Sequence, residues 1–217
     1  MSKIKIILAE DYAIVRRGIA SLLKLNPDFE IIAEVENGRE AIQKVEALQP
    51  DIVLMDIGMP VLNGLEATAH IKKKFPHIKV LIVTVQESEE FILQIIVSGA
   101  NGYVFKNSSP EALAHAVTIV AQTEKFFSPS LSPAEVQEYL KRVQDGNIAV
   151  DPLTPREKEI LQLIAEGHSH FNIAELLHLS IRTVDTHRNN IMQKLNIHDT
   201  ATLVHYAVKR GLIEIKR

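Results

Sequence analysis

The sequence predicts an α/β domain with a five-stranded, doubly wound parallel sheet, followed by a smaller all-α domain. Two observations divide the 217 residues in this way. Short runs of β-branched residues alternate with amphipathic stretches up to about residue 125, whereas no run beyond residue 153 indicates a strand before the last few residues. A stretch rich in Ser and Pro lies between the two parts. We therefore expect domains at residues 1–125 and 153–217, joined by a linker at 126–152.

The first domain contains five predicted strands separated by helices of ordinary length. This alternation favours a parallel sheet covered on both faces, because each crossover returns a helix to the sheet. In such sheets, ligands bind beyond the carboxyl ends of the strands. The strands are expected at Ile4–Ala9, Ile31–Val35, Ile52–Met55, Val80–Thr84 and Tyr103–Phe105, and the helices are expected to begin near Ala13, Arg39, Gly64, Ser88 and Pro110.

Three helix starts are marked by a Ser or Thr that directly precedes a Pro, namely Ser109, Ser132 and Thr154. A hydroxyl at the N-cap accepts a hydrogen bond from the first turn, and Pro suits the first helical position. Ser132 and Thr154 are also followed three residues later by Glu, which completes a capping box. We expect helices to begin at all three points, including a short linker helix over residues 134–143.

The composition excludes several classes of protein. There is no Cys, so disulfides, thiolate metal sites and thiol nucleophiles are excluded. No uncharged run approaches the roughly 18 residues of a membrane span, and the N-terminus lacks the apolar segment of a signal peptide, so a soluble cytoplasmic protein is expected.

Residues 153–217 contain 9 Lys and Arg against 7 Asp and Glu. If this domain binds DNA, one copy would therefore bind weakly.

Polar and charged side chains gather at the carboxyl ends of the predicted strands. Glu10 and Asp11 follow the first strand, Asp56 follows the third, Thr84 ends the fourth and Lys106 follows the fifth. With the first strand in the centre of the sheet, we expect these side chains to converge at one edge. Three close carboxylates need a cation, and their oxygens suit Mg²⁺. A carboxylate beside Mg²⁺ can attack phosphorus and form an aspartyl phosphate, whose oxygens Lys106 and Thr84 would contact.

A single Asp after a strand is more often a turn or cap residue than a nucleophile. Convergence at four strand ends favours the functional interpretation. The same residues match a known family: residues 1 to about 125 resemble the receiver domain of bacterial response regulators. This resemblance implies a flavodoxin-like sheet with strand order 2-1-3-4-5.

The resemblance also assigns roles to individual residues. It makes Asp56 the phosphoacceptor, within the run Asp56-Ile57-Gly58-Met59-Pro60. It implies that Glu10, Asp11, Asp56 and the backbone carbonyl of Gly58 bind the metal, that Thr84 and Tyr103 are switch residues, and that Lys106 contacts the phosphoryl group. The chain departs from the commoner family residues at Glu10, Val85 and Asn107, and the first two bear on metal geometry and phosphoryl access.

The second domain has the pattern of a helix-turn-helix, with two helices joined by about three residues. Ser180 is the expected N-cap of the second helix, in which Val184, Ile191 and Leu195 share one face and form the expected buried stripe. Arg188 and Lys194, at the sides, suit phosphate contacts. For an isolated amphipathic helix, a polar face that only contacts water would be a more common explanation than a DNA-binding face. The opposite face carries residues suited to base edges, which are Arg182, Asp185, Thr186, Asn189 and Gln193.

Residues 153–217 resemble the LuxR-type helix-turn-helix domain along their full length. The resemblance rests on Leu153-Thr154-Pro155-Arg156-Glu157 at the start, on Ile173-Ala174 and on the run from Thr183 to Ile191. It implies that this last run is the recognition helix, with Thr183 among the DNA contacts. It also implies that Ala201 to Arg210 is a dimer helix, in a domain of four helices.

A receiver followed by this domain is the arrangement of NarL/FixJ-type response regulators of two-component phosphorelay systems. The resemblance implies a sequence-specific DNA-binding transcription regulator, not a turnover enzyme, that a sensor histidine kinase phosphorylates on Asp56. Phosphorylation would promote homodimerisation, free the recognition helix, or both. Two alternatives stay open. One is a phosphohydrolase that uses the same aspartyl-phosphate chemistry, and the other is a regulator that binds DNA constitutively and uses its first domain for protein interactions.

Overall fold

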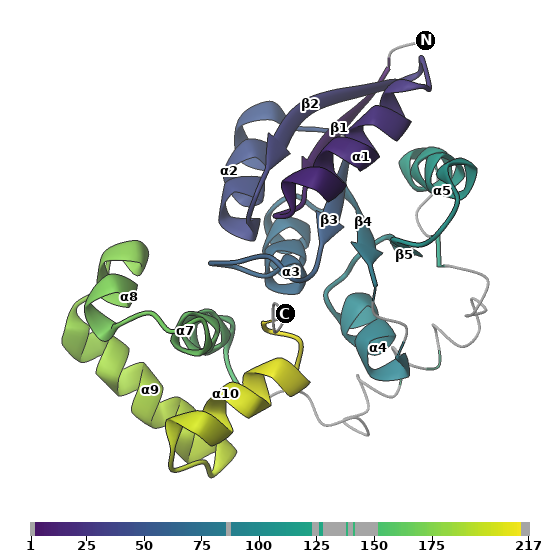
Figure 1. Cartoon of the computed structure of the whole chain (residues 1–217). Helices are drawn as coiled ribbons and strands as arrows, with labels where there is room; N and C mark the ends of the chain where they lie inside the picture. The colour runs from purple at the N-terminus through teal and green to yellow at the C-terminus, as the bar shows by residue number, and fades with distance from the viewer. Residues whose placement is uncertain are drawn as a thin grey trace.

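The computed structural model describes residues 3–85, 88–122, 126–127, 138, 141 and 152–213. Its N-terminal domain contains one sheet of five parallel strands in the order β2-β1-β3-β4-β5 (Figure 1). The α/β prediction and the strand order are confirmed. The strands are β1 (Ile4–Ala9), β2 (Phe29–Val35), β3 (Ile52–Asp56), β4 (Lys79–Thr84) and β5 (Gly102–Phe105). The helices between and after them are α1 (Ala13–Lys24), α2 (Gly38–Leu48), α3 (Gly64–Lys74), α4 (Glu89–Val97) and α5 (Pro110–Gln122).

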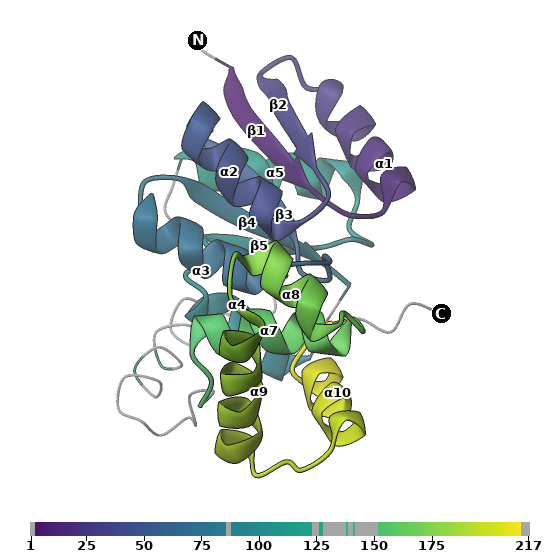
Figure 2. The ribbon, with the colours of Figure 1, turned by 90° about the vertical axis from the view of Figure 1, so that its left-hand side faces the viewer.

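Helices cover both faces of this sheet and form two apolar layers (Figures 1 and 2). α1 and α5 pack on one face, over side chains such as Leu8 and Leu54. α2, α3 and α4 pack on the other face, over Ile7 and Val53. Because neighbouring residues of β1 and β3 point to opposite layers and both are buried, these strands consist of nearly continuous apolar runs. The carboxyl end of β3 is the polar residue Asp56, which places it at the edge of the sheet.

The C-terminal domain consists of four helices in the part of the chain that the structure describes. They are α7 (Pro155–Ala165), α8 (His170–Leu177), α9 (Ile181–Leu195) and α10 (Thr200–Lys209). The predicted capping box at Thr154 is confirmed, since its side chain accepts from the N–H of Glu157 and the Glu157 side chain bonds back to Thr154. The core contains Val184 and Ile191, as predicted, with the half-buried Leu195 packed against it.

Some predicted boundaries differ from the observed ones. β2 begins at Phe29, whose side chain is buried beneath α1, two residues before the predicted start. α8 begins at His170, three residues before the apolar run that predicted it, because Ser169 caps this helix by accepting from the N–H of Asn172. The predicted linker helix over 134–143 lies outside the described residues except at Glu138 and Lys141, which are helical.

The two domains are in contact, with α7 nearest to the N-terminal domain. In both views α9 lies on the far side of α7 from the sheet (Figures 1 and 2). A hydrogen bond between Gln162 of α7 and Asn63, at the N-cap of α3, joins the domains. Among the described residues, none of the helices is both long and apolar enough to cross a membrane.

Candidate functional site

The three acidic residues predicted at the strand ends lie together. Glu10 and Asp11 follow β1, Asp56 ends β3, and one carboxylate oxygen from each lies within 4.8 Å of the others. Glu10 is 1% exposed and Asp56 is 6% exposed, so both charges are removed from water. Carboxylates at this spacing repel one another strongly unless a cation neutralises them, and an all-oxygen donor set suits a hard divalent cation. The cluster is therefore consistent with a metal site.

Lys106 supplies a cation to this cluster. Its Nζ lies 2.7 Å from Glu10 Oε2 and 2.9 Å from Asp56 Oδ1. Its backbone N–H donates to the carbonyl of Thr84, which fixes the residue just beyond the end of β5. Burial of Lys106 opposes its charge, but the carboxylates of Asp56 and Glu10 outweigh this effect and raise the pKa of the ammonium above its ordinary value. Lys106 thus stays charged at neutral pH and bridges two of the three carboxylates.

The remaining residues predicted for this site lie at the end of β4, in the loop after β3 and within β5. Thr84 ends β4 and is 1% exposed, and Gly58 is buried in the loop between β3 and α3. Tyr103 is fully buried in β5, with its ring centroid 5.4 Å from that of Phe105 and 6.2 Å from that of Phe127. Val85, which departs from the commoner family residue, is 59% exposed beside Thr84. The structure therefore brings the predicted acidic residues, Thr84 and Lys106 to the same end of the sheet, with Gly58 in the loop after β3, whereas Tyr103 lies within β5 and pairs with Ile82 of β4.

The predicted recognition helix α9 presents its polar face to solvent. Ser180 caps it by accepting from the N–H of Thr183, and the two hydroxyl oxygens lie 2.8 Å apart, so Thr183 takes part in the cap. Because α9 lies away from the N-terminal domain, none of that domain's described residues covers the predicted reading face. Its members Arg182, Asp185, Thr186, Asn189 and Gln193 are all exposed.

Three residues predicted to contact DNA already contact protein groups. Lys194 Nζ lies 2.7 Å from Oε2 of the buried Glu157. Asp185 Oδ1 lies 2.6 Å from Nδ1 of His170, which joins the start of α8 to α9. Arg188 donates to the Thr200 hydroxyl over 3.4 Å. These contacts hold α9 against α7, α8 and the start of α10.

The sequence did not single out the residues of α7 that contact the N-terminal domain. Gln162 is fully buried and bonds to the loop between β3 and α3, and Glu166 accepts from a backbone N–H of the same loop. One sequence feature could have indicated this contact, which is the single amide side chain within the apolar run Ile160-Leu161-Gln162-Leu163-Ile164. A polar residue at such a position implies a buried hydrogen-bond partner.

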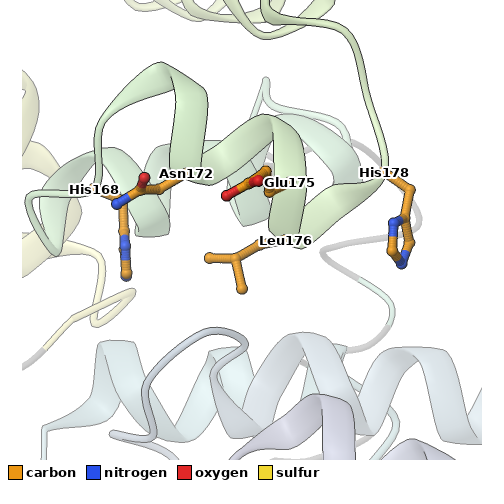
Figure 3. Close-up of a pocket in the computed structure, with 5 residues that line it drawn as sticks. All are labelled: His168, Asn172, Glu175, Leu176 and His178. Atoms are coloured by element: carbon orange, nitrogen blue, oxygen red, sulfur yellow. The ribbon is translucent and has the colours of Figure 1, made fainter.

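A shallow hollow of about 620 Å³ lies beside α8 and is lined by His168, Asn172, Glu175, Leu176 and His178 (Figure 3). The two histidines stand at opposite ends of the group, with Asn172, Glu175 and Leu176 between them (Figure 3). Among the described residues, the acidic cluster at the strand ends is the one group with metal-binding spacing. The hollow therefore offers no metal site.

Comparison with known proteins agrees with both parts of this geometry. The family model of the response regulator receiver domain matches residues 6–118, and the model of the bacterial regulatory proteins of the luxR family matches residues 151–207. The chain is 40% identical over 215 residues to the oxygen regulatory protein NreC of Staphylococcus carnosus, covering 97% of this chain and 99% of that protein. It is 33% identical to the transcriptional regulatory protein DegU of Brevibacillus brevis, covering 99% and 97%.

A solved structure supports the same comparison. The chain resembles the RcsB response regulator of Salmonella typhimurium, with a TM-score of 0.63 and 25% sequence identity, over 97% of this chain and 99% of that one. The likeness thus extends over both domains.

Proposed function

Because this chain belongs to the response regulators that join a receiver domain to a LuxR-family DNA-binding domain, we propose that Asp56 accepts the phosphoryl group that controls it. The chain is a phosphorylation-controlled response regulator and a DNA-binding transcription factor, and its family is not one of turnover enzymes. The phosphohydrolase alternative is therefore set aside. The observation that supports Asp56 is its place at the end of β3, where it meets both the acidic cluster and Lys106.

The metal ligands in this proposal are the carboxylates of Glu10, Asp11 and Asp56, with the backbone carbonyl of Gly58. The all-oxygen donor set within 4.8 Å supports Mg²⁺ as the cation. When bound, Mg²⁺ would neutralise the carboxylates and the charge that develops on the phosphoryl oxygens. Glu10 has a longer side chain than Asp, and its contact with Lys106 supports a role in holding that ammonium as well.

The chemistry assigned to the protein's own residues is simple. A carboxylate oxygen of Asp56 attacks phosphorus, so that a new P–O bond forms as the bond from phosphorus to the donor breaks. Lys106 then pairs its ammonium with a phosphoryl oxygen in place of the Asp56 oxygen, and the Thr84 hydroxyl donates to another. Tyr103 is the proposed aromatic switch beside them. The donor in this proposal is a phosphohistidine of a sensor histidine kinase.

DNA binding is assigned to α9, with the domain division at residues 1–125, 126–152 and 153–217. The exposed side chains of Arg182, Thr186 and Asn189 have the chemistry that reads base edges in the major groove. Arg188 and Lys194 would position the helix on the phosphates, with Thr183 and Asp185 contributing near its start. The domain is only mildly basic, which supports binding as a homodimer to paired half-sites.

Replacement of Asp56 tests the proposal. Acetyl phosphate with Mg²⁺ should tighten binding of the wild-type chain to its operator, and Asp56→Asn should abolish that tightening because the amide is not a nucleophile for phosphorus. The operator can be selected from random DNA, and affinity measured by fluorescence anisotropy at fixed salt. Asp28→Asn, at an exposed aspartate next to the start of β2, is the matched control and should respond like the wild type. Retained tightening in Asp56→Asn would reject Asp56 as the phosphoacceptor.

One observation favours a second candidate function, in which DNA binding is constitutive and the receiver serves protein interactions. The reading face of α9 is exposed while the domains are in contact, so the receiver does not have to leave for that face to reach DNA. Equal operator affinity with and without acetyl phosphate in the wild-type chain would support this candidate. Tightening that depends on Asp56 would exclude it.

A further inference from the structure

Two residues of the acidic cluster are consecutive, so one peptide bond affects the directions of both side chains. That bond joins Glu10 to Asp11 in the loop between β1 and α1. The N–H of Glu10 donates to the carbonyl of Val35 at 3.0 Å, which extends the pairing of β1 with β2 by one residue. The carbonyl of Glu10 belongs to the peptide bond that leads to Asp11, and its partner is a charged side chain.

That side chain is Arg16 of α1. Its Nη1 donates to the carbonyl of Glu10 at 2.6 Å. A hydrogen bond from an ionised donor is roughly twice as strong as one between two neutral groups. The side chain of Arg16 is only 13% exposed, so water competes little for this bond. The guanidinium therefore holds the peptide bond between Glu10 and Asp11 in one orientation.

Two carboxylates at the end of β2 hold the guanidinium in turn. Nη2 of Arg16 donates to Glu36 Oε1 at 2.7 Å, and Nε lies 3.7 Å from Glu34 Oε2. A guanidinium is planar and presents its N–H groups in fixed directions, so these contacts determine where Nη1 points. The two carboxylates also offset the charge of Arg16. The residue therefore acts on the cluster by directing a hydrogen bond and does not supply a free cation.

The carboxylate of Glu10 is held by other groups. Its Oε1 accepts from the N–H of Tyr12 at 3.2 Å, and its Oε2 lies 2.7 Å from Lys106 Nζ. Asp11 is half-buried, and the peptide bond that Arg16 holds sets the direction in which its side chain leaves the loop. Loss of the Arg16 bond would free this peptide bond to rotate, and the spacing between the carboxylates of Asp11 and Glu10 would no longer be fixed.

We propose that Arg16 is a positioning residue for the metal site, which keeps the carboxylates of Glu10 and Asp11 at the spacing that a divalent cation requires. Contacts that orient metal ligands without touching the metal contribute to its affinity, and their loss typically weakens binding about 10- to 100-fold. Arg16 acts through the backbone of Glu10 and is assigned no contact with the metal or with the phosphoryl group. This inference rests on the proposed function, in which the cluster binds the metal.

Arg16→Met tests the proposal. Met has an unbranched side chain but none of the N–H donors, so the affinity of the full chain for Mn²⁺ should fall about tenfold, at the lower end of the range for such contacts. Mn²⁺ suits the same oxygen ligands as Mg²⁺, and the electron paramagnetic resonance signal of free Mn²⁺ measures how much is bound. Arg17→Met, at the next and exposed position of α1, removes the same charge and should bind Mn²⁺ like the wild type.

Conservative variants separate the hydrogen bond from the charge. Arg16→Lys keeps the charge but lacks the fork that reaches both the Glu10 carbonyl and Glu36, so its Mn²⁺ affinity should stay closer to that of Arg16→Met than to that of the wild type. Glu36→Asp keeps a negative charge at an exposed position but shortens the side chain that holds Nη2, and it should also weaken Mn²⁺ binding. Glu30→Asp, at an exposed glutamate of β2, is the matched control and should not.

Phosphorylation by acetyl phosphate provides an independent measurement. In Arg16→Met, the Mg²⁺ concentration that gives half the maximal rate should rise by about the same factor as the Mn²⁺ dissociation constant, whereas the maximal rate at saturating Mg²⁺ should change little. A general loss of folded protein would lower the maximal rate and leave the half-maximal Mg²⁺ concentration unchanged, which would count against a positioning role.

Wild-type Mn²⁺ affinity in folded Arg16→Met, or full recovery in Arg16→Lys, would overturn the proposal. If Arg16→Met does not fold, wild-type affinity in Glu36→Asp would overturn it instead. If acetyl phosphate still tightens DNA binding through Asp56 in any of these cases, the proposed function survives and the positioning role alone fails. A wild-type chain that binds no Mn²⁺ would reject the proposed metal site and the positioning role together.

Discussion

At the scale of single residues, Lys106 determines how three clustered carboxylates, two of them buried, coexist. Its ammonium contacts Glu10 and Asp56 within a cluster that also contains Asp11. Its pKa is raised, so the stabilisation from this contact is fully present below the unfolded pKa of the lysine. It is lost only as the pH rises through the folded pKa, well into the alkaline range. At neutral pH the residue acts as a fixed positive charge.

Replacing Lys106 should make the stability of the protein depend on Mg²⁺. Lys106→Met leaves Glu10 and Asp56 buried without their cation, which should lower the free energy of unfolding by about 3 kcal/mol in metal-free buffer at pH 7. Added Mg²⁺ should restore much of the lost free energy of unfolding. In the variant, the metal can neutralise the carboxylates without competing against the Lys106 ammonium. Urea unfolding with and without Mg²⁺ measures both effects, with Lys44→Met at an exposed position as the control. A variant with the same response to Mg²⁺ as the wild type would contradict this view.

At the scale of helices, α9, the proposed recognition helix, makes contacts near both of its ends. His170 pairs with Asp185 near the start of α9, and Glu157 pairs with Lys194 near its end. Burial of Glu157 opposes its ionisation, but Lys194 and the N–H and hydroxyl of Thr154 outweigh burial and lower its pKa. The same carboxylate therefore caps α7 and anchors α9. The start of the domain and α9 are therefore stabilised together.

This anchor should fail in acid. Because the pKa of Glu157 is lowered on folding, its contribution is present above the unfolded pKa and is lost as the pH falls through the folded pKa. Glu157→Gln can keep the capping box but not the ion pair, so it should cost about 1 kcal/mol at pH 7, after allowance for the exposure of Lys194. That difference from the wild type should shrink towards zero below pH of about 4. Urea unfolding at several pH values, with Glu175→Gln as the control, measures it; a cost that does not change with pH would count against the ion pair.

Sequence patterns were sufficient to predict the order of strands and helices and the cluster at the strand ends, but not every boundary. Alternating apolar runs are local, and the rule that parallel strands end at one edge converts five scattered residues into one site. Patterns did not predict that Lys194 is already paired with Glu157, because these residues meet only when α7 and α9 cross. They also missed the first turn of α8, where a single Ser–amide contact at Ser169 extends the helix beyond its apolar run.

At the scale of the whole molecule, the two domains meet at more than one place. Besides the contact of α7 with the loop after Asp56, Gly211, in the turn that follows α10, lies against the ring of Phe91 in α4. Neither contact could be predicted from the sequence, because each depends on how two separately folded units are placed. A lone buried glutamine and a glycine after a helix each have several local explanations. Their shared role requires the three-dimensional structure.

The contact between Gly211 and Phe91 leads to a prediction for the addition of a single methyl group at Gly211. A side chain at Gly211 would overlap the ring of Phe91, and φ of 66° there is unfavourable for residues other than Gly. Gly211→Ala should therefore lower the free energy of unfolding by about 1 kcal/mol from backbone conformation alone, and also broaden the interdomain distances measured with spin labels. When Gly211→Ala is combined with Phe91→Ala, it should no longer broaden the interdomain distances, but it should still lower the free energy of unfolding.

A double-mutant cycle separates the two effects of Gly211→Ala. The single variants and the double variant should be non-additive in the spin-label distances if the ring is the obstacle. Additive effects would show that the turn after α10 does not rest on α4 in solution.

The open reading face of α9 has a consequence for how the regulator responds to its own abundance. If the proposed reading face is never hidden and the protein binds DNA as the proposed homodimer, an unmodified molecule differs from an activated one mainly in how readily two copies join on an operator. Joining is a second-order process, so a rise in the cellular amount of the protein substitutes for a signal, and target expression should climb more steeply than in proportion to dose. Under the proposed function, control by a kinase is then effective only while the protein is scarce, and the rate at which the protein is synthesised sets the threshold of the response.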